Sequence, residues 1–208
     1  MDGHEMKEDA MTSALESLRL AHQQTNQQLL RIVAHTDEGR LRTRPHASMN
    51  SMVWSVWHSF RSEDACIARF VVPQQQAFTT GDFLTKMGVP YKGDGFGMSD
   101  ADVTALSVGI DMAQLQAYGQ AVTALSAQAF AVIADWDWNV PFVADEIRAI
   151  CGRYADLADD DVDGTVGYAT SMTRGAYLYK HLYGHSQYHL GEISAIDGQV
   201  AGKRFFTW

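Results

Sequence analysis

Apolar residues recur at alternating steps of three and four in four segments of this 208-residue chain. Residues at this spacing lie along one line of an α-helix, so each segment predicts a helix that buries one face. The segments are 15–32, 49–70, 115–136 and 178–196. Strand signals are too short to build a sheet. The pattern predicts an all-α fold, and four such helices are typical of a four-helix bundle.

The connections are marked by helix-ending and helix-starting residues. Pro73 is expected to close the second helix and Gly198 the fourth. Residues 73–111 are too many for a tight hairpin, which predicts a crossover with short helices of its own. Within it, Ser99 with Asp102 three positions later predicts a capped helix start. A further short helix is expected around 144–154.

Composition limits the class of protein. The chain is 46% hydrophobic, enough for a single domain over 1–208, with residues 1–10 expected to form a disordered tail. Its net charge of −9 and lack of a Lys/Arg cluster argue against a nucleic-acid partner. Cys66 and Cys151 have no metal or redox spacing and are expected to be buried thiols of a reducing compartment.

The same reasoning addresses membranes and location. No run of about 20 apolar residues suits a transmembrane helix. The N-terminal stretch MDGHEMKEDAMTSALES is acidic and polar, where a signal peptide would be basic and then apolar. We therefore expect a cytoplasmic protein with no membrane partner.

The last helical segment carries three histidines, His181, His185 and His189, followed by Glu192. On a regular α-helix His185 and His189 point into the buried face, whereas His181 lies on its flank and about 12 Å from His189. Polar groups on successive buried positions cost free energy unless they share a partner. This spacing predicts that His185 and His189 bind one metal ion and that the helix supplies two ligands, not three.

A third ligand has to come from another helix, and the spacing leaves two candidates. His22 lies on the apolar line of the first helix. His58 lies on the opposite face of the second helix, beside Ser51, Trp54 and Arg61. That face is either exposed to solvent or the wall of a polar cavity, and the periodicity does not choose between them.

The stretches SMNSMVWSVWHSFRSED and YKHLYGHSQYHLGEI resemble the DinB-like, or YfiT-like, superfamily of metalloenzymes. The resemblance implies that His58, His185 and His189 are the metal ligands, with His58 chosen over His22. It implies a nickel or zinc ion, or iron as in some relatives. It also implies an up-down-down-up four-helix bundle, with a long crossover between helices two and three, that forms a homodimer. Trp57 and Tyr179 are expected to lie on exposed apolar flanks that a second subunit could cover.

The activity implied by this resemblance is a metal-dependent S-transferase or isomerase that joins a low-molecular-weight thiol to a small electrophile. Three neutral histidines leave an ion's charge unquenched and a coordination position open, so a bound water or thiol would lose its proton near pH 7. A hydrolase using metal-bound hydroxide and a non-catalytic metal or small-ligand binding protein are the alternatives.

Glu192 stands where the superfamily usually has Gln, and we expect it to be catalytic. Its carboxylate would orient a ligand histidine, accept a proton or join the metal shell. Glu63, on the apolar line of the second helix, is a further candidate beside the ion. Aromatic residues near both stretches are expected to line a pocket: Trp54, Trp57, Tyr183 and Tyr188.

Overall fold

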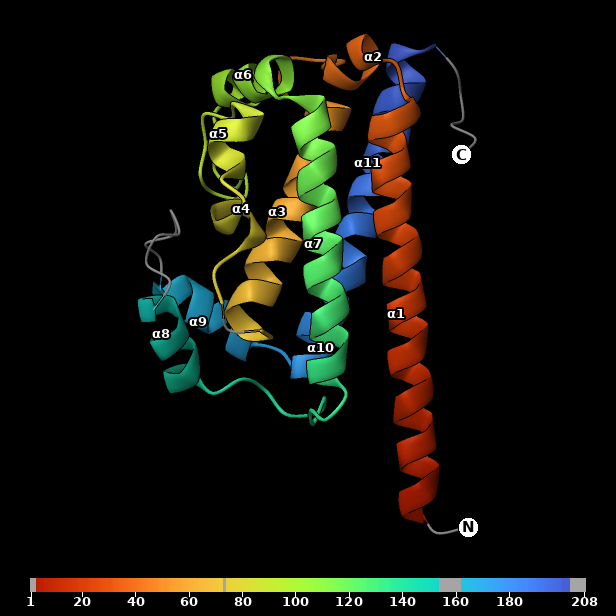
Figure 1. Cartoon of the computed structure of the whole chain (residues 1–208), viewed down its shortest axis with the longest axis vertical. Coiled ribbons are helices and arrows are strands. Elements are labelled where there is room, and N and C mark those ends of the chain that lie inside the picture. The colour runs from red at the N-terminus through yellow and green to blue at the C-terminus, as the bar shows by residue number, and fades with distance from the viewer. Residues whose placement is uncertain (1–2, 73, 154–161, 203–208) are drawn as a thin grey trace.

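A computed structural model describes residues 3–72, 74–153 and 162–202 of the chain (Figure 1). Within these residues there is no strand, and the one extended pairing is an isolated bridge between Pro141 and Thr173. The all-α class is therefore confirmed. The helices are α1 (Gly3–His35), α2 (Glu38–Arg42), α3 (Met52–Phe70), α4 (Ala77–Thr80), α5 (Phe83–Met87), α6 (Asp100–Gly109), α7 (Met112–Ile133), α8 (Ala144–Arg153), α9 (Val162–Thr170), α10 (Arg174–Tyr179), the π-helix η1 (Lys180–Gly184) and α11 (His185–Val200).

The long helices α1, α3, α7 and α11 run side by side along the long axis of the molecule (Figure 1). Helix α3 packs against α7 and α11, and α1 packs against α7. The description of this arrangement as a four-helix bundle stays a prediction, because the short helices α4, α6 and α8 add further contacts to α3.

Local sequence signals explain several helix boundaries. Helix α3 begins after Ser51, whose Oγ accepts a hydrogen bond from the Trp54 N–H, and it ends at Phe70, ahead of Pro73 in the sequence. The predicted capping box at the start of α6 is present, with Ser99 and Asp102 each accepting from the other's N–H. The crossover does carry short helices, α4 to α6, and α8 lies where the sequence predicted a short helix.

Two boundaries differ from expectation. Helix α1 starts at Gly3 and takes in most of the segment assigned to a disordered tail, because these residues include strong helix formers and no proline. The prediction that Gly198 ends the last helix is wrong, since α11 continues to Val200. A helix tolerates an isolated glycine, and the glycine with the left-handed backbone here is Gly202, with φ +66°.

Burial corrects one expectation about surfaces. Trp57, which the sequence placed on an apolar flank available to a dimer partner, is fully buried in the core. Tyr179, the second residue expected there, is 55% exposed. Tyr179 alone of this pair is therefore open to a second subunit.

The two cysteines differ in burial. Cys66 is buried, Cys151 is half-buried, and neither forms a disulfide. Burial raises the pKa of the Cys66 thiol, so this group stays protonated. Among the described helices, none combines the length and apolar character needed to cross a membrane.

Candidate metal centre

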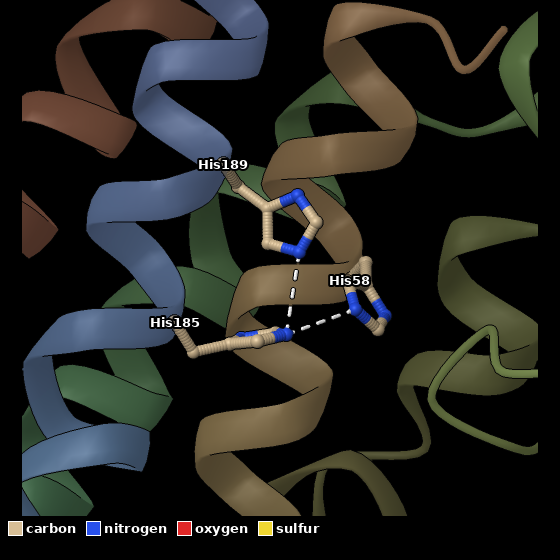
Figure 2. Close-up of side chains that lie close together, drawn as sticks. All are labelled: His58, His185 and His189. Carbon is tan, nitrogen blue, oxygen red and sulfur yellow. Dashed lines mark hydrogen bonds between the residues drawn. The ribbon is translucent and has the colours of Figure 1, made fainter.

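Three imidazole rings converge between α3 and α11 (Figure 2). The Nε2 atom of His185 lies 3.2 Å from Nε2 of His58 and 3.2 Å from Nε2 of His189. One ring nitrogen of each residue lies within 4.8 Å of those of the other two. We call these three residues the histidine triad. Of the two candidates for the third member, the structure brings His58 to the pair and leaves His22 elsewhere.

The helices that carry the triad fix the directions of its rings. His185 and His189 are four residues apart at the start of α11, so both side chains leave the same helix face. His58 projects from α3 with its ring stacked on Trp54, at 4.7 Å between centroids and 17° between planes. The same Trp54 ring meets His189 edge-on. Packing thus limits how far these rings can rotate.

Hydrogen bonds to the far sides of two rings define their tautomers. His58 Nδ1 contacts the backbone carbonyl of Asp94, and His189 Nδ1 lies 2.7 Å from Glu192 Oε2. A carbonyl and a carboxylate only accept, so both Nδ1 atoms carry the hydrogen. In a neutral imidazole this leaves a lone pair on Nε2. His58 and His189 therefore both aim a lone pair at the centre of the triad.

The centre of the triad holds more hydrogen-bond acceptors than hydrogens. His185 Nε2 has at most one hydrogen to donate, and it faces two acceptors at the same distance. Burial lowers the pKa of His58, and it lowers that of His185 to about 3, with the neighbouring histidines adding to the effect. The rings of His58 and His185 are therefore neutral near pH 7. Three converging imidazole nitrogens are a donor set that fits a divalent transition metal ion.

Glu192 holds His189 from behind. Its Oε2 accepts from His189 Nδ1 and from Ser55 Oγ at 3.0 Å, and its Oε1 accepts from Asn50 Nδ2 at 3.2 Å. Burial acts to raise the pKa of Glu192, but the hydrogen bonds from His189, Ser55 and Asn50 outweigh it and lower the pKa. Of the three roles expected for this carboxylate, the geometry supports orientation of a ring.

A loop after α5 holds His58 in the same way. Asp94 offers its carbonyl to His58, and the next residue, Gly95, has a φ of +110°. A Cβ on Gly95 would lie 2.8 Å from Trp54 and 3.0 Å from Trp57, closer than side chains pack. Only glycine lets this loop approach α3 so closely. Sequence reasoning missed Asp94, because a backbone carbonyl has no signature beyond the run of glycines around it.

His22 and Glu63, the other polar residues on apolar helix lines, pair with each other. His22 Nε2 lies 2.7 Å from Glu63 Oε1, and Asn26 and Ser126 donate to the same oxygen. All four residues are buried between α1, α3 and α7. Glu63, a candidate for a place beside the ion, makes no hydrogen bond to the triad, and its Oε1 lies in this separate cluster.

A pocket of about 460 Å³ opens beside the triad, with His58 and His185 in its wall. Its aromatic lining comes from Tyr91, Phe96 and Tyr168. The expected aromatic residues lie elsewhere. Trp54 stacks behind His58, Trp57 is in the core, Tyr183 packs on Tyr179, and Tyr188 is 72% exposed. The expected lining was wrong because the aromatic residues of the pocket come from the loop after α5 and from α9, where the sequence showed no apolar helical line.

His181 lies outside the triad but lines the same pocket. Its Nε2 is 3.2 Å from the Tyr168 hydroxyl, and burial lowers its pKa to about 4. The helix changes pitch here, since the His185 N–H bonds to the Lys180 carbonyl five residues earlier. This π turn holds Lys180, His181 and His185 along one pocket wall.

Comparison with known proteins agrees with this geometry. The family model described as the DinB superfamily matches residues 21–193. That range begins within α1 and includes the whole histidine triad and Glu192. No curated protein matches the chain.

Proposed function

Because the chain belongs to the DinB superfamily, we propose that the histidine triad holds one divalent metal ion and that the protein is a metal-dependent enzyme. This superfamily is commonly metal-binding, and the triad can hold an ion. The observation that carries the proposal is the convergence of two lone pairs, fixed by Asp94 and Glu192, on the third ring. Nickel and zinc suit three imidazole ligands best, and iron is a further candidate.

An ion held by three imidazole ligands would keep its full charge, bring the pKa of a bound water to about 7 and deprotonate a bound thiol. The chain's own residues supply position. Asp94 and Glu192 orient two of the rings, and the packing of Trp54 keeps solvent from the far side of His58. A molecule in the pocket meets the side of the triad formed by His58 and His185.

The pocket supports catalysis over a sealed metal-binding role. A site that only stores an ion has no need of a cavity of about 460 Å³ against two of its ligands. We propose a thiol S-transferase or isomerase that acts on a small electrophile, with a low-molecular-weight thiol as co-substrate. The homodimer, the cytoplasmic location and the absence of a nucleic-acid partner remain predictions from the sequence.

Metal analysis of the purified protein tests the first part. We expect about one equivalent of a divalent metal per chain. His185→Ala should abolish binding, because His185 faces both other ligands and two imidazoles hold such ions weakly. His181→Ala, one turn earlier and outside the triad, should retain the metal. Full occupancy in His185→Ala would rule out the site.

The activity is tested by screening the metal-loaded protein with thiols and small electrophiles and following thiol consumption. We expect turnover that His185→Ala loses and His181→Ala keeps in part. Ester substrates in the same screen report on the hydrolase alternative. A metal-loaded protein that consumes neither class would leave a binding protein and contradict the proposed catalysis.

A further inference from the structure

The pocket beside the triad is rich in positive charge, in contrast to the chain as a whole. The chain has a net charge of −9, yet four cationic side chains line this cavity against one carboxylate, that of Asp94. The four are Arg61, Arg69, Lys92 and Lys180. A local reversal of sign in a cavity attracts a charged ligand of the opposite kind.

Some of these cationic groups are bonded to other parts of the protein, and others can bind a ligand. Arg61 is buried, donates to Gln76 Oε1 and to the Lys92 carbonyl, and lies 3.6 Å from the buried Asp64 carboxylate. Its charge therefore holds the loop on α3. Lys92 and Lys180 are exposed, and within the described chain no carboxylate forms a salt bridge with either.

Lys180 is held in place without being neutralised. Its Nζ lies 4.6 Å from the centre of the Tyr168 ring, a cation–π contact that directs the ammonium group along the pocket wall. The π turn brings Lys180 and His185 onto this wall together. A group bound by Lys180 would therefore sit in the same cavity as the exposed side of the triad.

The one carboxylate in the pocket wall, that of Asp94, already accepts a hydrogen bond. Asp94 Oδ1 accepts the Phe96 N–H, and the carbonyl of the same residue accepts from His58. The remaining lining includes the aromatic faces of Tyr91, Phe96 and Tyr168, which suit an organic body. The volume, about 460 Å³, is that of a site for a small molecule and far exceeds a single inorganic ion.

We propose that this pocket selects small organic anions, binding the anionic group at Lys180 and Lys92 and presenting the rest of the molecule to His58 and His185. This deepens the proposed function by giving the charge class of its substrate. The proposal that this anion is a substrate rests on the proposed function, because it assumes a metal at the triad. Binding of the anion by the two lysines needs no metal.

The test compares benzoate with benzamide, which match in shape and differ in charge, by calorimetric titration of metal-loaded and metal-stripped protein. Phenyl phosphate and inorganic phosphate show whether the anion is a carboxylate or a phosphate and whether the aromatic body matters. We expect benzoate to bind at least about 10-fold more tightly than benzamide in both forms. Salt should weaken benzoate binding and leave benzamide binding unchanged.

Lys180→Ala should lower benzoate affinity by about 10-fold and reduce its salt dependence while metal content is unchanged. Lys86→Ala is the matched control, because Lys86 is an exposed lysine over the Phe83 ring and lies outside this pocket. Equal binding of benzoate and benzamide, or equal effects of the two variants, would overturn the proposal. So would benzoate binding that requires the metal and ignores Lys180. A protein that holds no metal but prefers benzoate through Lys180 would refute the proposed function and support this inference.

Discussion

At His189 the position of one hydrogen decides what the ring offers on its other side. Glu192 accepts from Nδ1, so Nε2 faces the triad with a lone pair. Without such an acceptor, the ring exchanges between its two tautomers. In one of them Nε2 carries the hydrogen and has no lone pair for a metal. Glu192 is therefore a positioning residue in this structure. Replacing it by Ala or by Gln distinguishes the effect of orienting the His189 ring from the effect of the negative charge.

Glu192→Ala should lower metal affinity by about 10–100-fold, because it removes the acceptor that fixes His189. Glu192→Gln, which restores the superfamily's usual residue, keeps an acceptor oxygen and should retain the metal. It should still shift the pH dependence of turnover, since a neutral acceptor raises the basicity of the ring less than a carboxylate does. Competition with a metal chelator and a pH–rate profile measure the two effects.

Glu38→Gln is the control, because the exposed Glu38 pairs with Arg42 and makes no contact of its own with the triad or with Glu192. Identical metal affinity in wild type and Glu192→Ala would show that the contact with His189 has no positioning role.

The three ligand candidates were within reach of the sequence, but for different reasons. His185 and His189 follow from helix periodicity, because two polar residues on one buried line need a common partner. His58 does not, since it lies off the apolar line of α3 and only the resemblance favoured it over His22. The residues that hold Glu192 in place could not be predicted from the sequence. Ser55 and Asn50 contact Glu192 from 137 and 142 residues away, and such distant pairs leave no local pattern.

At the scale of elements, two irregular pieces place the site between regular helices. Periodicity located α1, α3 and α7 well, because each buries a continuous stripe. It missed the π turn at Lys180–Gly184, since one extra residue in a single turn shifts the pattern too little to be seen. It also gave no account of the loop from Tyr91 to Phe96, whose position depends on close contact with α3 and not on a repeating stripe.

Gly95→Ala should lower both thermal stability and metal affinity. The new methyl group would meet Trp54 and Trp57, which forces the loop outward and withdraws the Asp94 carbonyl from His58. Thermal melting with and without metal measures both effects, because at a fixed metal concentration a more tightly bound ion raises the melting temperature further.

Gly97→Ala is the matched control. Gly97 also has a positive φ, +78°, but no atom lies within 4 Å of its added methyl group. It should therefore lose stability through backbone strain alone and keep the metal-induced rise in melting temperature. Equal losses of that rise in the two variants would contradict the role given to the loop.

At the scale of the whole molecule, the half-buried, neutral His181 ties stability to pH. Burial lowers the pKa of His181 to about 4, with Lys180 adding to this and Asp94 opposing it. The unfolded chain therefore binds a proton below about pH 6.5 that the folded protein refuses until about pH 4. Stability from this group is complete above pH 6.5 and is lost as the pH falls through that window.

In metal-stripped wild-type protein the free energy of unfolding should fall between pH 6.5 and 4, partly because unfolding takes up a proton at His181. His181→Gln should reduce that slope by the equivalent of nearly one bound proton. Urea unfolding at several pH values measures this slope independently of any overall loss of stability. Above pH 7 the two proteins should have parallel curves, because the ring is neutral in both states. Parallel curves down to pH 4 would show that His181 titrates alike in the folded and unfolded chain.

The triad joins helices that are far apart in the order of synthesis. His58 and His185 are separated by 127 residues, and their shared ion would close that whole span into one loop. A growing chain on the ribosome offers the metal only one imidazole of the triad, that of His58, until α11 has emerged, and one imidazole holds such ions weakly. On the proposed function, metal capture would therefore follow the packing of α3 against α11. On the proposed function, the apolar stripes of α1, α3 and α7 would pack against one another before the ion binds, and the supply of metal in the cell would set how much of the folded protein carries an ion.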